Sequence, residues 1–146
     1  MKDALLSKVF RGGFSALVLI SVVGCGDSGP ELFPVQGKVT LDGKPLADAG
    51  VMFMPTDKGP SANGTTDSDG HFELMTVNRA GAIRGTHPVV IAKRKYVPLK
   101  PGDEPVPAGV RAEWYSPKKY SNPATSGLTA DVGDGDNNFN FDLRSK

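Results

Sequence analysis

Residues 34–55 read PVQGKVTLDGKPLADAGVMFMP, and this stretch decides the fold of the 146-residue chain. Apolar and polar residues alternate over 34–41, which puts Val35, Val39 and Leu41 on one side of an extended chain. Such alternation is typical of a β-strand with one buried face. The sequence therefore predicts a half-buried strand at 34–41.

A tight turn and a second strand follow directly. The segment DGKP at 42–45 begins with Asp-Gly, a pair that favours a two-residue hairpin. In GVMFMP at 50–55, Val51 and Phe53 alternate with methionines and so share one face. We expect 50–55 to be the second strand of an antiparallel arrangement.

Five more short segments carry the same signal, with turn residues between them. We expect strands at 63–66, 71–76, 87–95, 126–132 and 138–143. The chain has 18 Gly and 12 Pro, and after residue 24 it has no long apolar run of helical period. Seven short strands with many turns predict an all-β sandwich that needs no helix, with GDGDN at 133–137 joining the last two strands as a hairpin.

Alternation within these strands predicts which side chains fill the core. The expected core residues are Val35, Val39, Leu41, Val51, Phe53, Phe72, Leu74, Val89, Ile91, Leu128, Val132, Phe139, Phe141 and Leu143. Of the two histidines, His71 alternates onto the polar face and should be exposed. His87 shares a face with Val89 and Ile91, so we expect a buried structural residue there and no metal site.

The first 24 residues have the pattern of a secretory signal peptide. A charged start precedes an eleven-residue apolar stretch at 14–24. Eleven helical residues span about 16 Å, too short for a hydrocarbon core of roughly 30 Å. A cleaved signal peptide therefore fits better than a transmembrane helix.

Cys25 is the one cysteine of the chain, and it follows the apolar stretch directly in VVGC. This segment resembles the bacterial lipobox, which implies removal of 1–24 and lipid modification of Cys25 with acyl chains such as palmitate. Two or more chains give stable membrane anchoring. The alternative is an ordinary signal peptide that leaves a free thiol. Because glycine follows Cys25 where aspartate would retain a lipoprotein at the inner membrane, we favour the outer membrane, facing the periplasm or the exterior.

The rest of the chain divides into a short tether, 25–33, and one domain, 34–143. The tether GDSGPELF has linker composition, so the domain is expected to lie close to the membrane. Without residues 1–24, 14 basic and 15 acidic residues remain. A nearly neutral domain gives no electrostatic reason for a nucleic-acid partner.

Three motifs in order resemble the carboxypeptidase regulatory-like domain. They are VQGKVTLDGKPLADAGVMFMP, GTTDSDGHFEL and GAIRGTHPVVI, and the closing KYSNPATSGLT and NFNFDL resemble a subgroup of small bacterial lipoproteins. The resemblance implies a seven-stranded transthyretin-like (prealbumin-like) β-sandwich over 34–143. It also implies a non-catalytic module without a cofactor. The related 5-hydroxyisourate hydrolase needs several histidines and a C-terminal Tyr-Arg-Gly-Ser, whereas this chain ends in DLRSK.

Two acidic turns are candidates for calcium binding. Asp67 and Asp69 stand one residue apart before Gly70, and Asp134 and Asp136 stand in GDGDN. A full calcium loop needs more oxygen ligands than either turn offers. We expect hairpin turns in which the carboxylates accept backbone N–H bonds. The calcium alternative gains weight if the two turns meet at one end of the sandwich.

Residues 96–125 show no convincing strand pattern, although they contain six prolines and the one tryptophan. Long loops in compact domains are usually functional or disordered. Trp114, Tyr115 and Tyr120 near two lysines predict a surface for a protein partner or a glycan. The alternative is that Trp114 and Tyr115 cover an open sheet edge.

These patterns lead to three hypotheses for function. The first is a binding or scaffold module anchored at the cell envelope, with 96–125 as its contact surface. The second is an accessory factor for an envelope hydrolase or transporter. The third is a calcium-stabilised surface adhesin domain.

Overall fold

The computed structural model describes residues 29–102 and 109–146, and strands are its main element. The predicted signal peptide, Cys25 and the start of the tether lie outside these residues. No helix within the two described ranges is long and apolar enough to span a bilayer. The predicted all-β class is confirmed.

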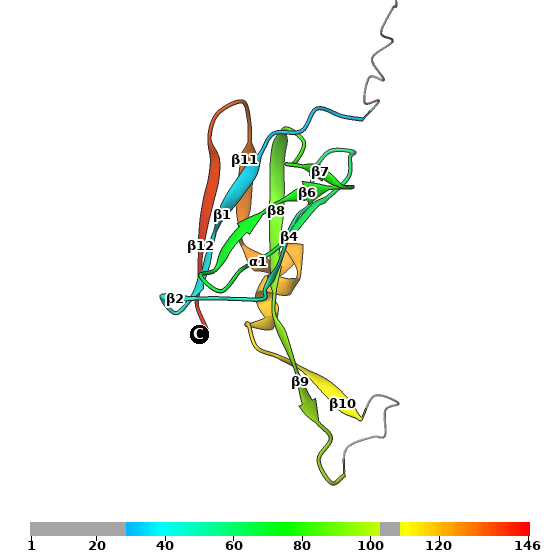
Figure 1. Cartoon of the computed structure of the whole chain (residues 1–146), viewed down its shortest axis with the longest axis vertical. Helices are drawn as coiled ribbons and strands as arrows, with labels where there is room; N and C mark the ends of the chain where they lie inside the picture. Colours follow the sequence, from blue (N-terminus) through cyan, green and yellow to red (C-terminus); the bar gives the residue numbers. More distant parts are fainter. Residues whose placement is uncertain (1–28, 103–108) are drawn as a thin grey trace, which may run out of the picture.

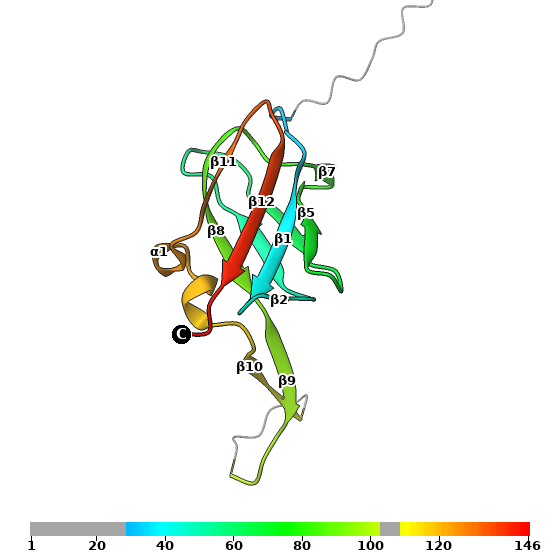
Figure 2. The ribbon, with the colours of Figure 1, turned by 90° about the vertical axis from the view of Figure 1, so that its left-hand side faces the viewer.

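Two sheets face each other across a shared core, and we call them sheet A and sheet B (Figures 1 and 2). Sheet A contains β1 (Val35–Leu41), β2 (Lys44–Pro45), β5 (His71–Glu73) and β12 (Asn137–Leu143). Sheet B contains β3 (Gly50–Phe53), β4 (Ala62–Thr65), β6 (Met75–Thr76), β7 (Arg79–Ala80), β8 (Gly85–Ala92) and β11 (Thr129–Val132). The strand order in sheet B is β11-β8-β3-β4-β6-β7.

Strand β1 is the centre of sheet A, which is why its sequence is decisive. It pairs in parallel with β12, from Val35 opposite Asn137 to Leu41 opposite Leu143. It also pairs antiparallel with β2 and with β5. At the end of β1, Asp42 and Gly43 both adopt positive φ, as a two-residue hairpin requires. The predicted turn at 42–45 is confirmed.

The expected core residues meet between the sheets. All fourteen are buried or partly buried, and Leu41, Leu128 and Phe139 are the partly buried ones. Phe53 is fully buried at the centre, with ring centroids 5.6 Å from Phe139, 6.1 Å from Phe141 and 6.4 Å from Phe72. These aromatic contacts between β3 of sheet B and β5 and β12 of sheet A hold the two sheets together.

His87 lies in this core with no exposed surface, while His71 is exposed, as predicted for both. The His87 Nδ1 lies 2.8 Å from the Gly85 carbonyl oxygen, so Nδ1–H donates and the Nε2 lone pair faces the core. Within the described part of the chain, Nε2 has no hydrogen-bond partner. Burial lowers the pKa of His87, because apolar surroundings disfavour the imidazolium.

Stability should therefore fall as the pH drops below the ordinary histidine pKa of about 6.5. The unfolded chain takes up a proton there that the folded chain resists, at a cost of up to about 1.4 kcal/mol per pH unit. His87→Phe should flatten the urea-unfolding free energy between pH 7 and pH 5. The carboxylates with lowered pKa, Asp42, Asp67 and Glu113, lose their contributions only at more acidic pH. Equal pH slopes for the two proteins would contradict this role of His87.

Several predicted strands are divided differently in the structure. The predicted strand 71–76 is two strands, because β5 pairs in sheet A and β6 pairs in sheet B. The predicted strand 87–95 divides into β8 and β9, and the two-residue strands β2 and β7 were not expected. The count of seven strands is therefore not what the described residues show.

The predicted hairpin at 133–137 is wrong. Strand β11 pairs with β8 in sheet B, whereas β12 pairs with β1 in sheet A, so the turn crosses between the sheets. The Asn137 side chain closes this turn: its Oδ1 accepts from Gly133 N–H at 3.0 Å, and its Nδ2 donates to the Gly133 and Pro34 carbonyls. Turn chemistry reveals where a chain reverses, and it does not reveal which strand becomes the partner.

The expectation that no helix is needed is also wrong. A 3₁₀ turn covers Lys118–Ser121, and the short helix α1 covers Pro123–Ser126. Asn122 caps α1, since its Oδ1 accepts from Ala124 N–H at 2.8 Å, and Gly127 ends it in a left-handed conformation. The segment NPATSG carries this cap, proline and glycine pattern, which the sequence interpretation overlooked.

Candidate functional site

The segment predicted to lack strands contains an antiparallel pair, so that expectation is corrected. Strand β9 (Arg94–Pro98) continues from β8, and β10 (Val110–Trp114) returns beside it. We call this pair the arm. It projects from the end of the molecule opposite to the start of the described chain (Figures 1 and 2).

The base of the arm is fixed by Ser116, which is buried. Its hydroxyl accepts from Lys93 N–H at 2.8 Å, and its own N–H donates to the Lys93 carbonyl at 3.2 Å. The Tyr115 N–H donates to the same carbonyl at 3.0 Å. The two strands of the arm are therefore joined firmly where they leave the sandwich.

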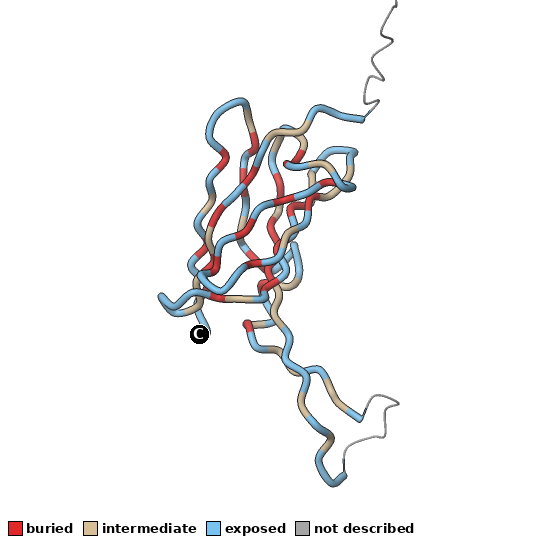
Figure 3. The backbone as a smooth tube through the Cα atoms, in the orientation of Figure 1, coloured by how far each residue is buried: buried red, intermediate tan, exposed pale blue. Residues whose placement is uncertain are grey.

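One face of the arm combines aromatic side chains with the cation Arg94. Residues directly opposite in an antiparallel pair share a face, so Arg94 lies beside Trp114 and Tyr96 beside Ala112. The Arg94 guanidinium lies 4.3 Å from the Trp114 ring centroid, within the range of a cation–π contact. Tyr96 is 71% exposed. Figure 3 shows the arm as exposed or intermediate along its described strands.

The other face of the arm is charged. Glu113 accepts from Arg111 at 2.7 Å and pairs with Lys95 Nζ at 3.2 Å. The hydrogen bond from Arg111, and then that from Lys95, lower the pKa of Glu113. This network joins the strands across the face opposite to Tyr96.

The aromatic residues predicted as a site separate in the structure. Trp114 and Tyr115 belong to the arm and its base, where Tyr115 is 53% exposed and its ring centroid lies 4.8 Å from Lys93 Nζ. The Trp114 ring contacts Arg94 of β9, and the Tyr115 ring contacts Lys93, which lies between β8 and β9.

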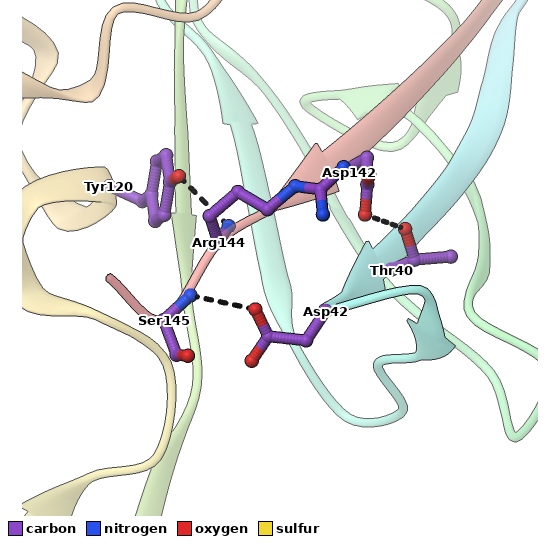
Figure 4. Close-up of polar contacts among 6 residues, drawn as sticks. All are labelled: Thr40, Asp42, Tyr120, Asp142, Arg144 and Ser145. Carbon is purple, nitrogen blue, oxygen red and sulfur yellow. Dashed lines mark hydrogen bonds and ion pairs between the residues drawn. The ribbon is translucent and has the colours of Figure 1, made fainter.

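Tyr120 is buried, and we treat it as a packing residue instead of a binding residue. Its hydroxyl accepts from the Arg144 N–H at 3.0 Å (Figure 4). In the same region, Ser145 N–H donates to Asp42 at 3.0 Å, a bond that lowers the pKa of Asp42. Tyr120 thus helps to hold the chain after β12.

Sequence reasoning missed Arg94 and Tyr96. Part of the signal was present, because VRAEW alternates apolar and polar residues as a short strand does, whereas KRKYVP does not. The prolines in and around these two segments argued against strands there. The exposed site that the structure assembles is therefore the arm face of Arg94, Tyr96 and Trp114, with Tyr115 at its base.

Charge is unevenly divided between the arm and the rest of the chain. Residues 93–119 hold seven basic and three acidic residues, and the other residues from 25 onward hold seven basic and twelve acidic ones. The arm region is therefore cationic and the remainder anionic. Such separation favours encounters between the arm and an acidic surface.

The two acidic turns lie at opposite ends of sheet A. The turn at 67–70 packs beside Val39, whereas the turn at 133–136 adjoins Pro34 through Asn137. Asp134 pairs with Arg84. The two turns therefore do not meet, which was the arrangement that would favour calcium binding. Among the described residues, no three His, Cys, Asp or Glu side chains gather as a metal site.

Asp67 instead holds its own turn. Its Oδ1 accepts from the N–H groups of Asp69 and His71, both at 2.9 Å, and these bonds lower its pKa. Asp67→Ala should reduce the free energy of unfolding, because both donors lose their acceptor. Asp69→Ala, which removes no such acceptor, is the control. A melting temperature that rises on adding calcium and falls in EDTA would show that the turn has a metal-binding role instead.

Taken together, the geometry defines a class: an all-β, sandwich-like protein with a projecting two-stranded arm. Comparisons with protein-family models, curated proteins and solved structures found no match to this chain.

Proposed function

We propose that this protein is a lipid-anchored, non-catalytic binding module of the cell envelope whose arm contacts an acidic partner protein. The observation that carries the proposal is the arm itself. A two-stranded hairpin is at best marginally stable alone in water. Here β9 and β10 contact chiefly each other among the described elements, and their shared face of Arg94, Tyr96 and Trp114 is exposed or partly exposed. A partner that covers this face would bury the aromatic side chains.

The composition of the arm supports a protein partner. Tyrosine, tryptophan and arginine are the residues that dominate protein-binding hot spots. The guanidinium held over Trp114 keeps its N–H groups available for a carboxylate. The cationic balance of residues 93–119 adds attraction over a longer range.

The proposed anchor gives the arm its direction. Lipid at Cys25 would place the start of the described chain beside the membrane, and the arm lies at the other end of the molecule (Figure 1). The transthyretin-like arrangement implied by the sequence motifs belongs to the same proposal, supported by the two-sheet core. If the partner is an envelope hydrolase or transporter, the protein acts as an accessory factor for that partner.

The anchor and the arm are tested separately in the full chain. Cys25→Ser should release the protein from the membrane fraction and abolish labelling with palmitate. If the variant stayed membrane-bound and labelled, Cys25 would not be the site of lipid attachment.

For the arm, the chain is purified from solubilised membranes and its co-purifying proteins are quantified. Tyr96→Ala and the double variant Trp114→Ala, Tyr115→Ala should each lose an acidic partner. The matched control is Met52→Ala, which truncates a partly exposed side chain on sheet B. Equal melting temperatures of control and arm variants would show that folding is intact. An unchanged partner set would overturn the assignment of the arm.

A further inference from the structure

The outer face of sheet A, away from the core, is hollowed along β1. A hollow of about 570 Å³ lies over β12, β1 and β5. A second one of about 510 Å³ adjoins it toward the start of β1, and Gln36, Glu73 and Asn138 line both. We call the two together the groove. Its volume is in the range of small-molecule binding sites, and it is separate from the arm.

Strand pairing arranges polar side chains in two rows across the groove. In the first row Gln36 lies between Asn138 of β12 and Glu73 of β5. In the second row Lys38 lies between Asn140 and His71. Neighbours in a row are about 4.8 Å apart, and the rows are about 6.7 Å apart along the strands.

These six side chains make no hydrogen bond or close ion pair with any described residue, although Lys38 and His71 act electrostatically on Asp67. The next row differs, because the Thr40 hydroxyl donates to the Asp142 carboxylate at 2.7 Å (Figure 4). Five of the six are exposed and Lys38 is half-buried. The groove thus presents donors and acceptors that are available for hydrogen bonds to a ligand. It ends at the row of Thr40 and Asp142, which bond to each other.

The kinds of group present select the class of ligand. Three amides both donate and accept, Lys38 donates, and the Glu73 carboxylate accepts. The carboxylates of Asp67, Glu73 and Asp136 outweigh the Lys38 ammonium in charge, which disfavours an anion. Sugar hydroxyls both donate and accept, and they match such a mixture. No exposed aromatic ring lines the groove, since Phe72 is buried beneath it, so hydrogen bonds must provide the recognition.

We propose that the groove binds a neutral oligosaccharide through the amides of Gln36, Asn138 and Asn140. The second hollow extends along β1, which gives room for more than one sugar ring. This site goes beyond the proposed function, because it lies on another surface and requires neither the anchor nor the arm. It makes the protein a module with two separate contacts, one to a protein and one to a glycan.

Saturation-transfer NMR on the full chain, in a detergent without a sugar headgroup, tests this site. The probes are the β-1,4-linked tetrasaccharides of glucose and of N-acetylglucosamine at about 10 mM, because affinity from a few exposed hydrogen bonds is expected near the millimolar range. We expect transfer to at least one probe. The Asn140→Ala variant should bind that probe about threefold to tenfold more weakly, which is the effect expected from the loss of one hydrogen bond.

Asn63→Ala is the matched control, because it makes the same change on the exposed face of β4 in sheet B. It should leave binding unchanged, and so should Tyr96→Ala on the arm. The proposed sugar site is contradicted if neither tetrasaccharide receives saturation, or if the Asn140→Ala variant binds the sugar as tightly as the natural chain does. Loss of sugar binding in Tyr96→Ala would place the site on the arm and also overturn it. None of these results depends on the partner protein.

Discussion

Phe53→Ala is expected to lower the free energy of unfolding by about 3–5 kcal/mol, the largest loss for any single truncation in this core. Phe53 has no exposed surface, and its ring contacts Phe72 and Phe141 as well as His87, whose ring centroid is 5.9 Å away. Removing the ring opens a cavity between the two sheets that rigid strands cannot close. Urea unfolding measures the loss.

Phe53→Leu is the control for this truncation. It keeps most of the buried volume and should cost clearly less than the alanine variant. If Phe53→Ala cost under about 1 kcal/mol, the ring would not be the centre of the core, because truncations of that kind are cheap only where the site is exposed or collapses.

Gly37→Ala is expected to destabilise the protein by about 3 kcal/mol or more, the upper end of the cost of overpacking. A Cβ at Gly37 would fall on the carbonyl oxygen of Phe139 in the paired strand β12 and 2.7 Å from Phe72 Cζ. The carbonyl belongs to backbone that β1 and β12 hold in register. The methyl group can therefore be accepted only by separating the central pair of sheet A.

Gly50→Ala is the matched control, since it also adds a methyl group within a strand. Its Cβ would lie 3.7 Å from the Ala92 carbonyl oxygen, an ordinary contact. The Gly50 variant should unfold within about 1 kcal/mol of the natural chain. Equal stability of the two variants would contradict the close approach of β12 to Gly37.

The sequence could predict the core because alternation is a local property. Val39, Phe53 and Ile91 each stand two residues from other apolar residues, and that spacing alone places them inside. The pairing of strands is not local. Nothing in DVGDGDNNF distinguishes a hairpin from the crossover that brings β12 beside β1, because both need the same turn residues.

The candidate site was predicted in part. Aromatic composition drew attention to Trp114 and Tyr115, and both lie on the arm or at its base. Tyr120 shared that composition, and only its burial in the folded chain shows that its ring packs inside. The groove had no sequence signal, because its rows combine residues that are far apart in the chain, such as Gln36, Glu73 and Asn138. Register between distant strands is what assembles it.

Photo-crosslinking from the arm tests the central claim most directly. A photoreactive amino acid replaces Tyr96 in the full chain, in native membranes, and the adducts are identified by mass spectrometry. The same probe at Asn63 on the exposed face of sheet B is the control. We expect the arm probe to give a protein adduct with an acidic surface that the control lacks, and high salt should weaken it. An arm probe whose adducts match those from position 63 would contradict the proposal that the arm is the binding surface.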